Sequence, residues 1–500
     1  MCRSCWPAVN FNSWTETPAI TLSPPAVAGD RKGSPIQDDL AVTATHNSDH
    51  DISRRDCVAA MGGGLGVLGL AQMLGAADHG RPQSRPRAKR VIQLFMNGGP
   101  FQGDFFDPKP ALTTYAGQRP EEVQLRTENK TGGLMPVPFR YRPGGESGLP
   151  VSDLLPGFRQ CMDDVCVLRS VYTDNPNHGP ALLMMNKGTI TPKRPSMGSW
   201  FLYGLGSENE NLPGYVVLCP GRPVRFSILW SSAFLPGENQ GTYINHSQLD
   251  PRKMIPFLSG SGVTVENQRR QLELLRRINS RHLKPRQGDG RLQTRLKAME
   301  TAFRMQFEAS DAFDLAREPQ HIRQAYGSGH FANGCLLARR LAERGVRFTQ
   351  VYYGNGQPWD THTNHNQSVS KLARDIDQPM SALLLDLKQR GLLEDTLVIW
   401  GGEFGRTPTT ESRGDNQGRD HNHFGFTMWM AGGGVRGGMT YGETDEFGFR
   451  AVQDRVHIHD LHATVLHLLG VDHERLVYRY AGRDFRLTDV YGNVVQRILS

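Results

Sequence analysis

The sequence predicts an α/β protein with a parallel sheet and a helical insertion. In the second half of the chain, a strand over 347–353 is followed by a polar loop, a helix over 371–390 and an apolar strand over 396–400. Strand, helix and strand in this order form a parallel α/β unit. Residues 262–330 are instead rich in Arg and Gln, with apolar residues at helical spacing. We therefore expect an α/β domain over residues 90–495 that carries a helical insertion over 262–330.

Composition supports a globular chain and argues against nucleic acid as a partner. Of the 500 residues, 38% are hydrophobic and 21% are charged, which is adequate for a core. The net charge is +7, but Arg and Lys are scattered and no basic-aromatic repeat accompanies them, so no nucleic acid partner is expected. The seven cysteines form no Cys-x-x-Cys pair. Cys161 and Cys166 are close enough in sequence to bridge, but we expect buried free thiols.

The N-terminal residues indicate an export leader rather than part of the fold. Residues 1–50 are rich in Pro, Ser, Thr, Asp and His without periodicity, so we expect disorder. Residues 51–77 place Arg54 and Arg55 before a glycine-rich apolar run, the layout of a twin-arginine signal peptide. The run is too short and glycine-rich for a stable membrane span; a buried glycine-rich helix is the alternative. The expected partner is the twin-arginine export machinery, and the expected location is periplasmic or extracellular.

Two strands in the first part of the domain are each followed by a candidate functional residue. The strand over 91–96 ends at the turn NGGP (97–100), after which Asp104 could be a metal ligand. The strand over 165–172 leads to His178 at the start of an apolar helix. Helix N-termini favour anions, so His178 could face a substrate, or it could only form a hydrogen bond at the helix start.

Apolar spacing predicts the remaining helices. An amphipathic helix over 334–346 ends near Gly345, and the helix over 371–390 stops at Gly391. One face of the second helix carries Leu372, Ile376, Met380, Leu383, Leu384 and Leu387. Near the C-terminus, Asp460 is expected to cap a helix with the core face Leu461, Val465, Leu468 and Leu469. The histidines of that segment are expected to be structural, although His457 and His459 could point into a cleft.

Carboxylates and imidazoles gather three times between residues 359 and 423. The groups are Asp360, His362 and His365 in WDTHTNH, Glu403 with Arg406 in GGEFGRTP, and Asp420, His421 and His423 in GRDHNHFGF. Two of the three lie beside strand ends, and ligands of open α/β sheets bind beyond the carboxyl ends of the strands. Oxygen and nitrogen ligands of this kind suit zinc, manganese or a harder divalent ion such as calcium. The pattern predicts a metal site.

Four phrases of the sequence together resemble one protein family. They are GGPFQGDFFDPKP, WDTHTNH, GEFGRTP and GRDHNHFGF, which occur in this order. The chain is thereby similar to the exported family known as domain of unknown function 1501, within the alkaline phosphatase and sulfatase superfamily. The segments LLEDTLVIWGGEFG and DLHATVLHLLGVD also look like parts of sulfatases. The resemblance covers roughly residues 90–490.

This resemblance implies a doubly wound α/β sandwich with a metal site beyond the strand ends. Superfamily enzymes hydrolyse phosphate or sulfate esters, using a metal-held nucleophile and one or two divalent ions that stabilise the charged transition state. By position, Asp360 with His362 or His365 would be a ligand pair. Glu403 would be the acidic residue after the next strand, and His423 the late histidine. His178 and Arg406 would be the catalytic residues, and a small-molecule or polysaccharide ester the substrate.

The sequence also departs from the superfamily pattern. Alkaline phosphatases have Asp-His where this chain has Glu403-Phe404, and sulfatases end the first strand in Asp where this chain has Asn97. At the sulfatase nucleophile position the chain reads HGPAL (178–182), so a formylglycine nucleophile is excluded there. His178 could attack phosphorus, bind metal or do neither. We expect an exported metal-dependent ester hydrolase. The alternatives are a non-catalytic metal- or glycan-binding protein, and a phosphoryl-transferring mutase that the export signal disfavours.

Overall fold

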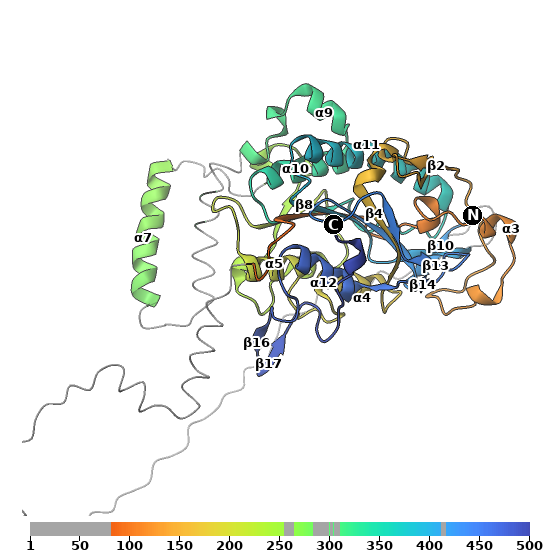
Figure 1. Cartoon of the computed structure of the whole chain (residues 1–500). Helices are drawn as coiled ribbons and strands as arrows, with labels where there is room; N and C mark the ends of the chain where they lie inside the picture. Colours follow the sequence, from red (N-terminus) through yellow and green to blue (C-terminus); the bar gives the residue numbers. More distant parts are fainter. Residues whose placement is uncertain (1–81, 255–264, 284–299, 301–303, 305–310, 412–416) are drawn as a thin grey trace, which may run out of the picture. The chain divides into compact units, whose positions relative to one another are not determined.

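The computed structural model describes residues 82–254, 265–283, 300, 304, 311–411 and 417–500 (Figure 1). The predicted disordered segment (1–50) and the predicted signal peptide (51–77) lie outside these residues, and so does most of the helical insertion between 284 and 310. Within the described ranges, no helix combines the length and the apolar character that crossing a membrane requires.

A nine-stranded sheet forms the centre of the domain (Figure 1). Its spatial order is β6-β5-β7-β1-β8-β11-β4-β12, and β15 also pairs with β4. Every neighbouring pair is parallel except the two that β11 forms with β8 and β4, so β11 alone is reversed. The bounds are β1 Arg90–Phe95, β4 Val165–Tyr172, β5 Tyr215–Cys219, β6 Thr242–Asn245, β7 Phe348–Tyr352, β8 Thr396–Gly401, β11 Phe426–Ala431, β12 Met439–Tyr441 and β15 Val456–His457.

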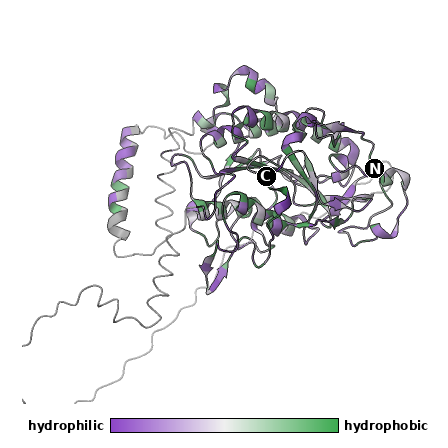
Figure 2. Ribbon diagram, viewed as in Figure 1, coloured by the Kyte–Doolittle hydropathy of each residue, from purple (hydrophilic) through white to green (hydrophobic). Residues whose placement is uncertain are grey.

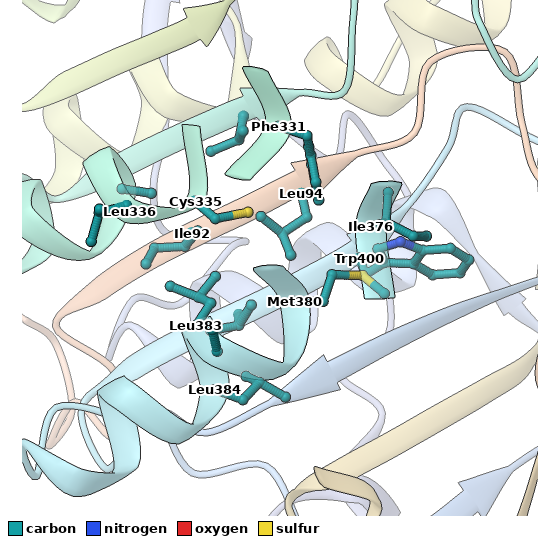
Figure 3. Packing of buried hydrophobic residues seen from close by; sticks show 14 of the residues in the cluster. Ile92, Leu94, Phe331, Cys335, Leu336, Ile376, Met380, Leu383, Leu384 and Trp400 are labelled. Carbon is teal, nitrogen blue, oxygen red and sulfur yellow. The ribbon is translucent and has the colours of Figure 1, made fainter. Parts of the chain in front are cut away.

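Helices cover both faces of the sheet because alternate strand residues point in opposite directions. On one face, Ile92 and Leu94 pack against helices that carry Phe331 and Leu383 (Figure 3). On the other face, Val91 and Phe95 belong to a second apolar cluster. The first layer is α9 Gln320–Tyr326, α10 His330–Glu343 and α11 His365–Gln389; the second is α4 His178–Lys187, α5 Met197–Leu205 and α12 Ile458–Leu468. The predicted doubly wound, mostly parallel α/β fold is confirmed.

The predicted elements are present, with shifts at their ends. β4 and β11 have the predicted bounds, whereas α10 starts four residues earlier than the 334 predicted, at His330. The largest shift is in α11, which begins at His365 rather than at 371. Its buried side runs through His365 and Val369 before Leu372. The core-facing stripe therefore starts with an imidazole, which an apolar pattern does not reveal.

The cap of helix α12 and the state of two cysteines bear on two smaller predictions. The N-cap of α12 is His457, and Asp460 completes a capping box by accepting a 2.9 Å hydrogen bond from the backbone N–H of His457. Asp460 is thus a capping residue but not the N-cap that the sequence indicated. Cys161 and Cys166 are buried and free, as expected.

The other elements are short hairpins and turns around the sheet. The hairpins are β2 Tyr141–Gly144 with β3 Leu149–Ser152, β9 Gly405–Thr410 with β10 Arg419–Asn422, β13 Glu443–Thr444 with β14 Ala451–Gln453, and β16 Tyr478–Tyr480 with β17 Arg483–Phe485. The remaining helices are α3 Ala111–Thr114, α6 Pro251–Met254, α7 Val265–Leu283, η1 Gln102–Asp104, η2 Glu121–Val123, η3 Phe158–Asp164, η4 Phe226–Trp230, η5 Gly237–Asn239, η7 Leu315–Arg317 and η8 Gln496–Ile498. The central strands are largely apolar, whereas α7 is largely polar (Figure 2).

Candidate metal centre

The parallel strands deliver the candidate ligands to one edge of the sheet. β1, β4, β7 and β8 run in the same direction, so their carboxyl ends meet there. His178 is the first residue of α4, which follows β4, and Asp360 lies in the loop after β7. Glu403 comes shortly after β8. The β9–β10 hairpin then pairs His421 with Arg406, which explains how two distant sequence phrases meet.

Four side chains converge on one carboxylate oxygen of Asp360. Its Oδ1 lies 2.7 Å from Nε2 of His362, 3.1 Å from Nε2 of His421 and 3.2 Å from Nε2 of His178. Nη2 of Arg406 lies 2.6 Å from the same oxygen. One ligand atom from each histidine and one oxygen of Asp360 all lie within 4.8 Å of one another. We call these three histidines and Asp360 the Asp360 cluster.

Each histidine of the Asp360 cluster is backed by its own glutamate. The pairs, each through Nδ1, are His178 with Glu403, His362 with Glu411, and His421 with Glu128. An ionised carboxylate can only accept a hydrogen bond, so each Nδ1 carries a proton, and once Nε2 is deprotonated its lone pair would be available to a cation at the centre. Metal-binding histidines have this arrangement, because the carboxylate fixes the ring and raises its basicity.

The charges around the Asp360 cluster favour a cation at its centre. Burial alone would raise the pKa of Asp360, but its interactions with the three imidazoles and the charge of Arg406 hold that pKa far below its usual range. Hydrogen bonding to Asp360, assisted by Glu411, raises the pKa of His362 to about 9. Burial alone would lower the pKa of His178, but the negative charges of Asp360 and Glu403 outweigh that effect and the pKa is raised.

Buried histidines elsewhere in the chain have the opposite tendency. Burial lowers the pKa of His246 to about 4 and that of His462 to about 3. Burial by itself therefore does not explain the raised pKa values of His178 and His362. The negative charge of the surrounding carboxylates raises these two pKa values. A divalent cation at the same place would neutralise that charge.

One nitrogen of the Asp360 cluster lacks a partner. Nε2 of His178 is buried and lies 3.2 Å from Asp360 Oδ1, but the angles do not make a hydrogen bond. A buried polar atom without a partner is costly, and a cation between the two atoms would satisfy both. The donors are three imidazole nitrogens and one carboxylate oxygen, a set that divalent transition metals accept. The residues present therefore fit a metal ion.

The turn after β1, residues 97–100, holds Glu403 and the Asp360 loop in place. The backbone N–H of Gly98 lies 3.1 Å from both carboxylate oxygens of Glu403. Gly98 has a φ of 115°, and a Cβ there would lie 2.4 Å from the backbone nitrogen of Asp360, so only glycine fits. The amide of Asn97 donates to the carbonyl of Gly354 at 3.0 Å. Asn97 thus holds the turn that leads to Asp360, a role for which an amide suits better than a carboxylate.

Phe404 and Arg406 enclose the cluster. Phe404 stands where the sequence comparison expected a histidine, and Arg406 was expected to be catalytic. The ring of Phe404 is fully buried and lies 4.7 Å from the rings of both His178 and His421. Phe404 is therefore an apolar wall behind two imidazoles. Arg406 is also fully buried, and besides Asp360 it contacts the carbonyls of Gly98 and Gly99. Its guanidinium holds Asp360 and the glycine turn together.

Two predicted ligands, Asp104 and His365, form a separate buried pair. Nε2 of His365 lies 2.8 Å from Oδ2 of Asp104, and its Nδ1 lies 2.6 Å from the hydroxyl of Thr361. Both members of the pair are fully buried. Because Thr361 lies between Asp360 and His362 in sequence, this pair anchors the ligand loop from behind. The structure does not bring either residue into the Asp360 cluster.

The structure separates the remaining predicted ligands as well. The ring of His423 lies against Phe424, at 3.9 Å between centroids, outside the cluster. Asp420 accepts a 2.7 Å hydrogen bond from the backbone N–H of Asn129, next to Glu128. Asp420 therefore helps to hold Glu128 beside His421. Together with His362 and Glu411, Asp420 also forms a second group whose ligand atoms lie within 4.8 Å of one another.

Sequence analysis did not single out Glu128 or Glu411. Glu128 lies in a polar loop, 293 residues from the histidine that it contacts, and nothing in its surroundings marks it. Glu411 follows the GRTPTT strand, and its position shortly before the GRDHNH phrase was the one available signal. Residues that orient ligands through their outer nitrogen carry no spacing rule of their own.

Comparisons with known proteins give one family and several distant structures. A model of the family described as "Protein of unknown function (DUF1501)" matches residues 88–499. No curated protein gives a significant match. Among solved structures, the chain is similar to Ps i-CgsB in complex with k-i-k-neocarrahexaose, at 9% identity over 78% of this chain and 74% of that chain, with a TM-score of 0.35.

Two other solved structures are similar to the chain at the same low level. One is the lipoteichoic acid synthase LtaP from Listeria monocytogenes, at 8% identity over 80% of this chain and 74% of that chain, with a TM-score of 0.35. The other is a mutant of TAB5 alkaline phosphatase with Mg bound, at 12% identity over 77% of this chain and 99% of that chain, with a TM-score of 0.31.

Proposed function

We propose, from the premise that this chain belongs to the DUF1501 family, that it is a metal-dependent hydrolase of phosphate or sulfate esters. The observation that carries the proposal is the Asp360 cluster, in which three imidazole Nε2 atoms face one carboxylate oxygen and each imidazole is backed by a glutamate. The superfamily resemblance of the sequence supplies the reaction class. Fold alone does not establish an activity, so the site carries the argument.

The Asp360 cluster would hold a divalent ion, and zinc suits the donors best. Imidazole nitrogens are preferred by zinc, whereas calcium takes about six to eight oxygen ligands. When bound, the ion would supply a Lewis acid and would lower the pKa of a bound water towards neutrality. The three glutamates keep the Nε2 lone pairs directed inward, and Arg406 neutralises part of the charge of Asp360. Phe404 keeps water away from the back of two ligand rings.

The geometry favours His178 as a ligand over His178 as a nucleophile. Its Nδ1 is held by Glu403 at 2.7 Å and its Nε2 is directed at Asp360. An imidazole that attacks phosphorus needs one free nitrogen lone pair directed at the substrate. His178 would therefore help to hold the ion, and the ion would supply the Lewis acid for the ester hydrolysis that we propose. The position of His178 between Glu403 and Asp360 also disfavours a mutase. The second candidate is therefore a metal- or glycan-binding protein without turnover.

Metal content and hydrolysis measured on the same samples test the proposal. We expect the purified chain to retain zinc and to hydrolyse a nitrophenyl phosphate or a nitrophenyl sulfate. Asp360→Asn and His421→Ala should lose both metal and activity. The control is His423→Ala, which removes an imidazole of the same loop outside the cluster and should keep both. Unchanged metal content in Asp360→Asn would contradict the site, and metal without hydrolysis of any ester would favour the binding protein.

We also propose that the chain is exported through the twin-arginine pathway. The support is the placement of Arg54 and Arg55 before a glycine-rich apolar run, in residues outside those that the structure describes. Replacing both arginines by Lys should leave the protein in the cytoplasm, measured by cell fractionation. The control is the Lys substitution of Arg85 and Arg87, two arginines beyond the run. Export of the first variant at the wild-type level would contradict this proposal.

A further inference from the structure

The guanidinium of Arg225 lies against Gly179, the residue that follows His178 of the Asp360 cluster. A Cβ added to Gly179 would lie 2.5 Å from Nη2, 2.9 Å from Nε and 3.1 Å from Cζ of Arg225. The guanidinium therefore rests on the backbone of the residue that follows His178. Arg225 is exposed, and in the described part of the chain no carboxylate forms an ion pair with it. Its charge therefore lies next to the first turn of α4, the helix that begins with His178.

The loop that carries Arg225 is tied to the turn that carries Asp360. The backbone N–H of Arg222 donates to the side chain of Asn355 at 2.7 Å. The backbone N–H of Gly356 donates to the carbonyl of Arg222 at 3.0 Å. The same turn leads directly to Asp360. The arginine loop and the Asp360 loop therefore hold a fixed relation to each other, although they lie far apart in sequence.

The backbone at Arg225 adopts a conformation that arginine disfavours. Arg225 has a φ of 67° and the next residue, Phe226, has a φ of 31°. Two consecutive residues in the left-handed region are strained unless the surroundings impose the conformation. Here the ring of Phe226 packs 5.1 Å from the rings of both Trp230 and Tyr243. The packing fixes the turn, and the turn aims the guanidinium at Gly179.

Electrostatics defines what this guanidinium would meet. Besides its own Asp360, the cluster has the carboxylates of Glu403, Glu411 and Glu128 behind its histidines. The buried guanidinium of Arg406 pairs with Asp360. An anionic ester that approaches this centre is repelled by the carboxylates. The exposed guanidinium of Arg225, next to Gly179, would offset that repulsion. A guanidinium also offers two parallel N–H groups, which match two oxygens of a tetrahedral anion.

We propose that Arg225 binds the non-bridging oxygens of a phosphate or sulfate ester while the reacting ester faces the Asp360 cluster. This inference rests on the proposed function and adds to it the residue that selects an anionic tetrahedral substrate. Arg225 is a substrate-binding residue in this account. The strained turn is the structural device that positions it.

The test measures the binding of inorganic phosphate to the zinc-loaded full chain by calorimetry. Arg225→Gln should weaken phosphate binding by about 10-fold to 100-fold, the effect of losing hydrogen bonds to a charged group. Zinc content should be unchanged. Lys193→Gln is the control, because it removes one positive charge from an exposed residue between α4 and α5 and leaves the arginine loop intact. The control should bind phosphate as the wild type does.

Two further variants separate the position of the guanidinium from its charge. Gly179→Ala keeps Arg225 but places a methyl group where the guanidinium rests, so phosphate binding should fall while zinc content and Tm stay unchanged. Arg225→Gly relieves the left-handed strain, so it should raise Tm while weakening phosphate binding. Loss of binding together with a gain in Tm is the signature of a strained functional residue.

The outcomes distinguish this inference from the proposed function. If the wild type binds zinc and phosphate, and Arg225→Gln binds phosphate equally well, the role of Arg225 is refuted and the metal site stands. If Lys193→Gln weakens phosphate binding as much as Arg225→Gln, the effect is one of general charge and the inference also fails. If the wild type retains no zinc, the proposed function fails, and the role of Arg225 fails with it.

Discussion

The three glutamates behind the Asp360 cluster should contribute unequally to metal affinity, in an order that their burial sets. Each would be replaced by Gln, which keeps the size of the side chain but removes its charge. The exposed fractions of the three side chains are 0% for Glu403, 18% for Glu411 and 31% for Glu128. Water screens a partly exposed charge, so the loss should fall from Glu403 to Glu411 to Glu128.

The magnitude follows from what such residues contribute to metal sites. Removing a carboxylate behind a metal-binding histidine typically weakens metal binding by about 10-fold to 100-fold. At about 1.4 kcal/mol for each factor of ten, this range corresponds to about 1.4 to 2.8 kcal/mol. Glu403→Gln should lie near the upper end, because Glu403 is fully buried and also accepts from Gly98. Glu128→Gln should lie near the lower end.

The measurement is a competition titration of zinc against a chromophoric chelator at fixed pH. Glu122→Gln is the control, since Glu122 lies exposed in the same loop as Glu128 and contacts none of the three histidines. We expect its zinc affinity to equal that of the wild type. Equal affinities in all four variants, or a larger loss in Glu128→Gln than in Glu403→Gln, would refute the assignment of these carboxylates to the ligand rings.

Three further predictions concern pH and stability. Zinc must displace the proton of His362, whose pKa is about 9, so apparent zinc affinity should rise by up to about tenfold per pH unit from pH 7 and level off as the pH passes 9; a flat titration between pH 7 and pH 8 would contradict this. Gly98→Ala should lower the free energy of unfolding by more than about 2 kcal/mol, because its Cβ would meet the backbone of Asp360. Gly117→Ala, which shares a positive φ but has open space around it, should cost less in the same urea titration. Glu318→Gln should cost about 3 kcal/mol at neutral pH by breaking buried ion pairs with Arg339 and Arg340. Desolvation opposes ionisation of Glu318, but those arginines outweigh it and lower its pKa, so the difference from the wild type should shrink as pH falls through 4.

The fold was predictable from the sequence wherever one periodic signal covered a whole element. β4 and β11 are largely apolar runs with a polar residue or a glycine on each side, and the structure gives them the predicted ends. The start of α11 was mispredicted because its first core-facing side chain is His365 rather than an apolar residue. The resemblance to the DUF1501 family is confirmed by the match over residues 88–499. Composition and periodicity thus identified the layers, and polar residues at buried positions obscured one boundary.

The candidate site was only partly accessible to the same reasoning. Spacing drew attention to Asp360, His362 and His421, which the structure brings together. It drew equal attention to His365 and His423, because a sequence does not show which side of a loop or helix an imidazole occupies. His178 was marked as a helix-start residue with three open roles. The structure holds its Nδ1 at Glu403 and places its Nε2 3.2 Å from Asp360, which no local sequence pattern reveals.

The separation of the contacting residues along the chain has a consequence for the order of events during synthesis. Glu128 and His421 are 293 residues apart, and His178 and Glu403 are 225 residues apart. Contacts of such long range form late, after most of the chain has been made and ordered. A nascent chain that has not reached β10 lacks His421 and cannot assemble the centre. Uptake of the ion should therefore follow folding rather than guide it, and zinc retention would serve as a read-out that the domain is complete.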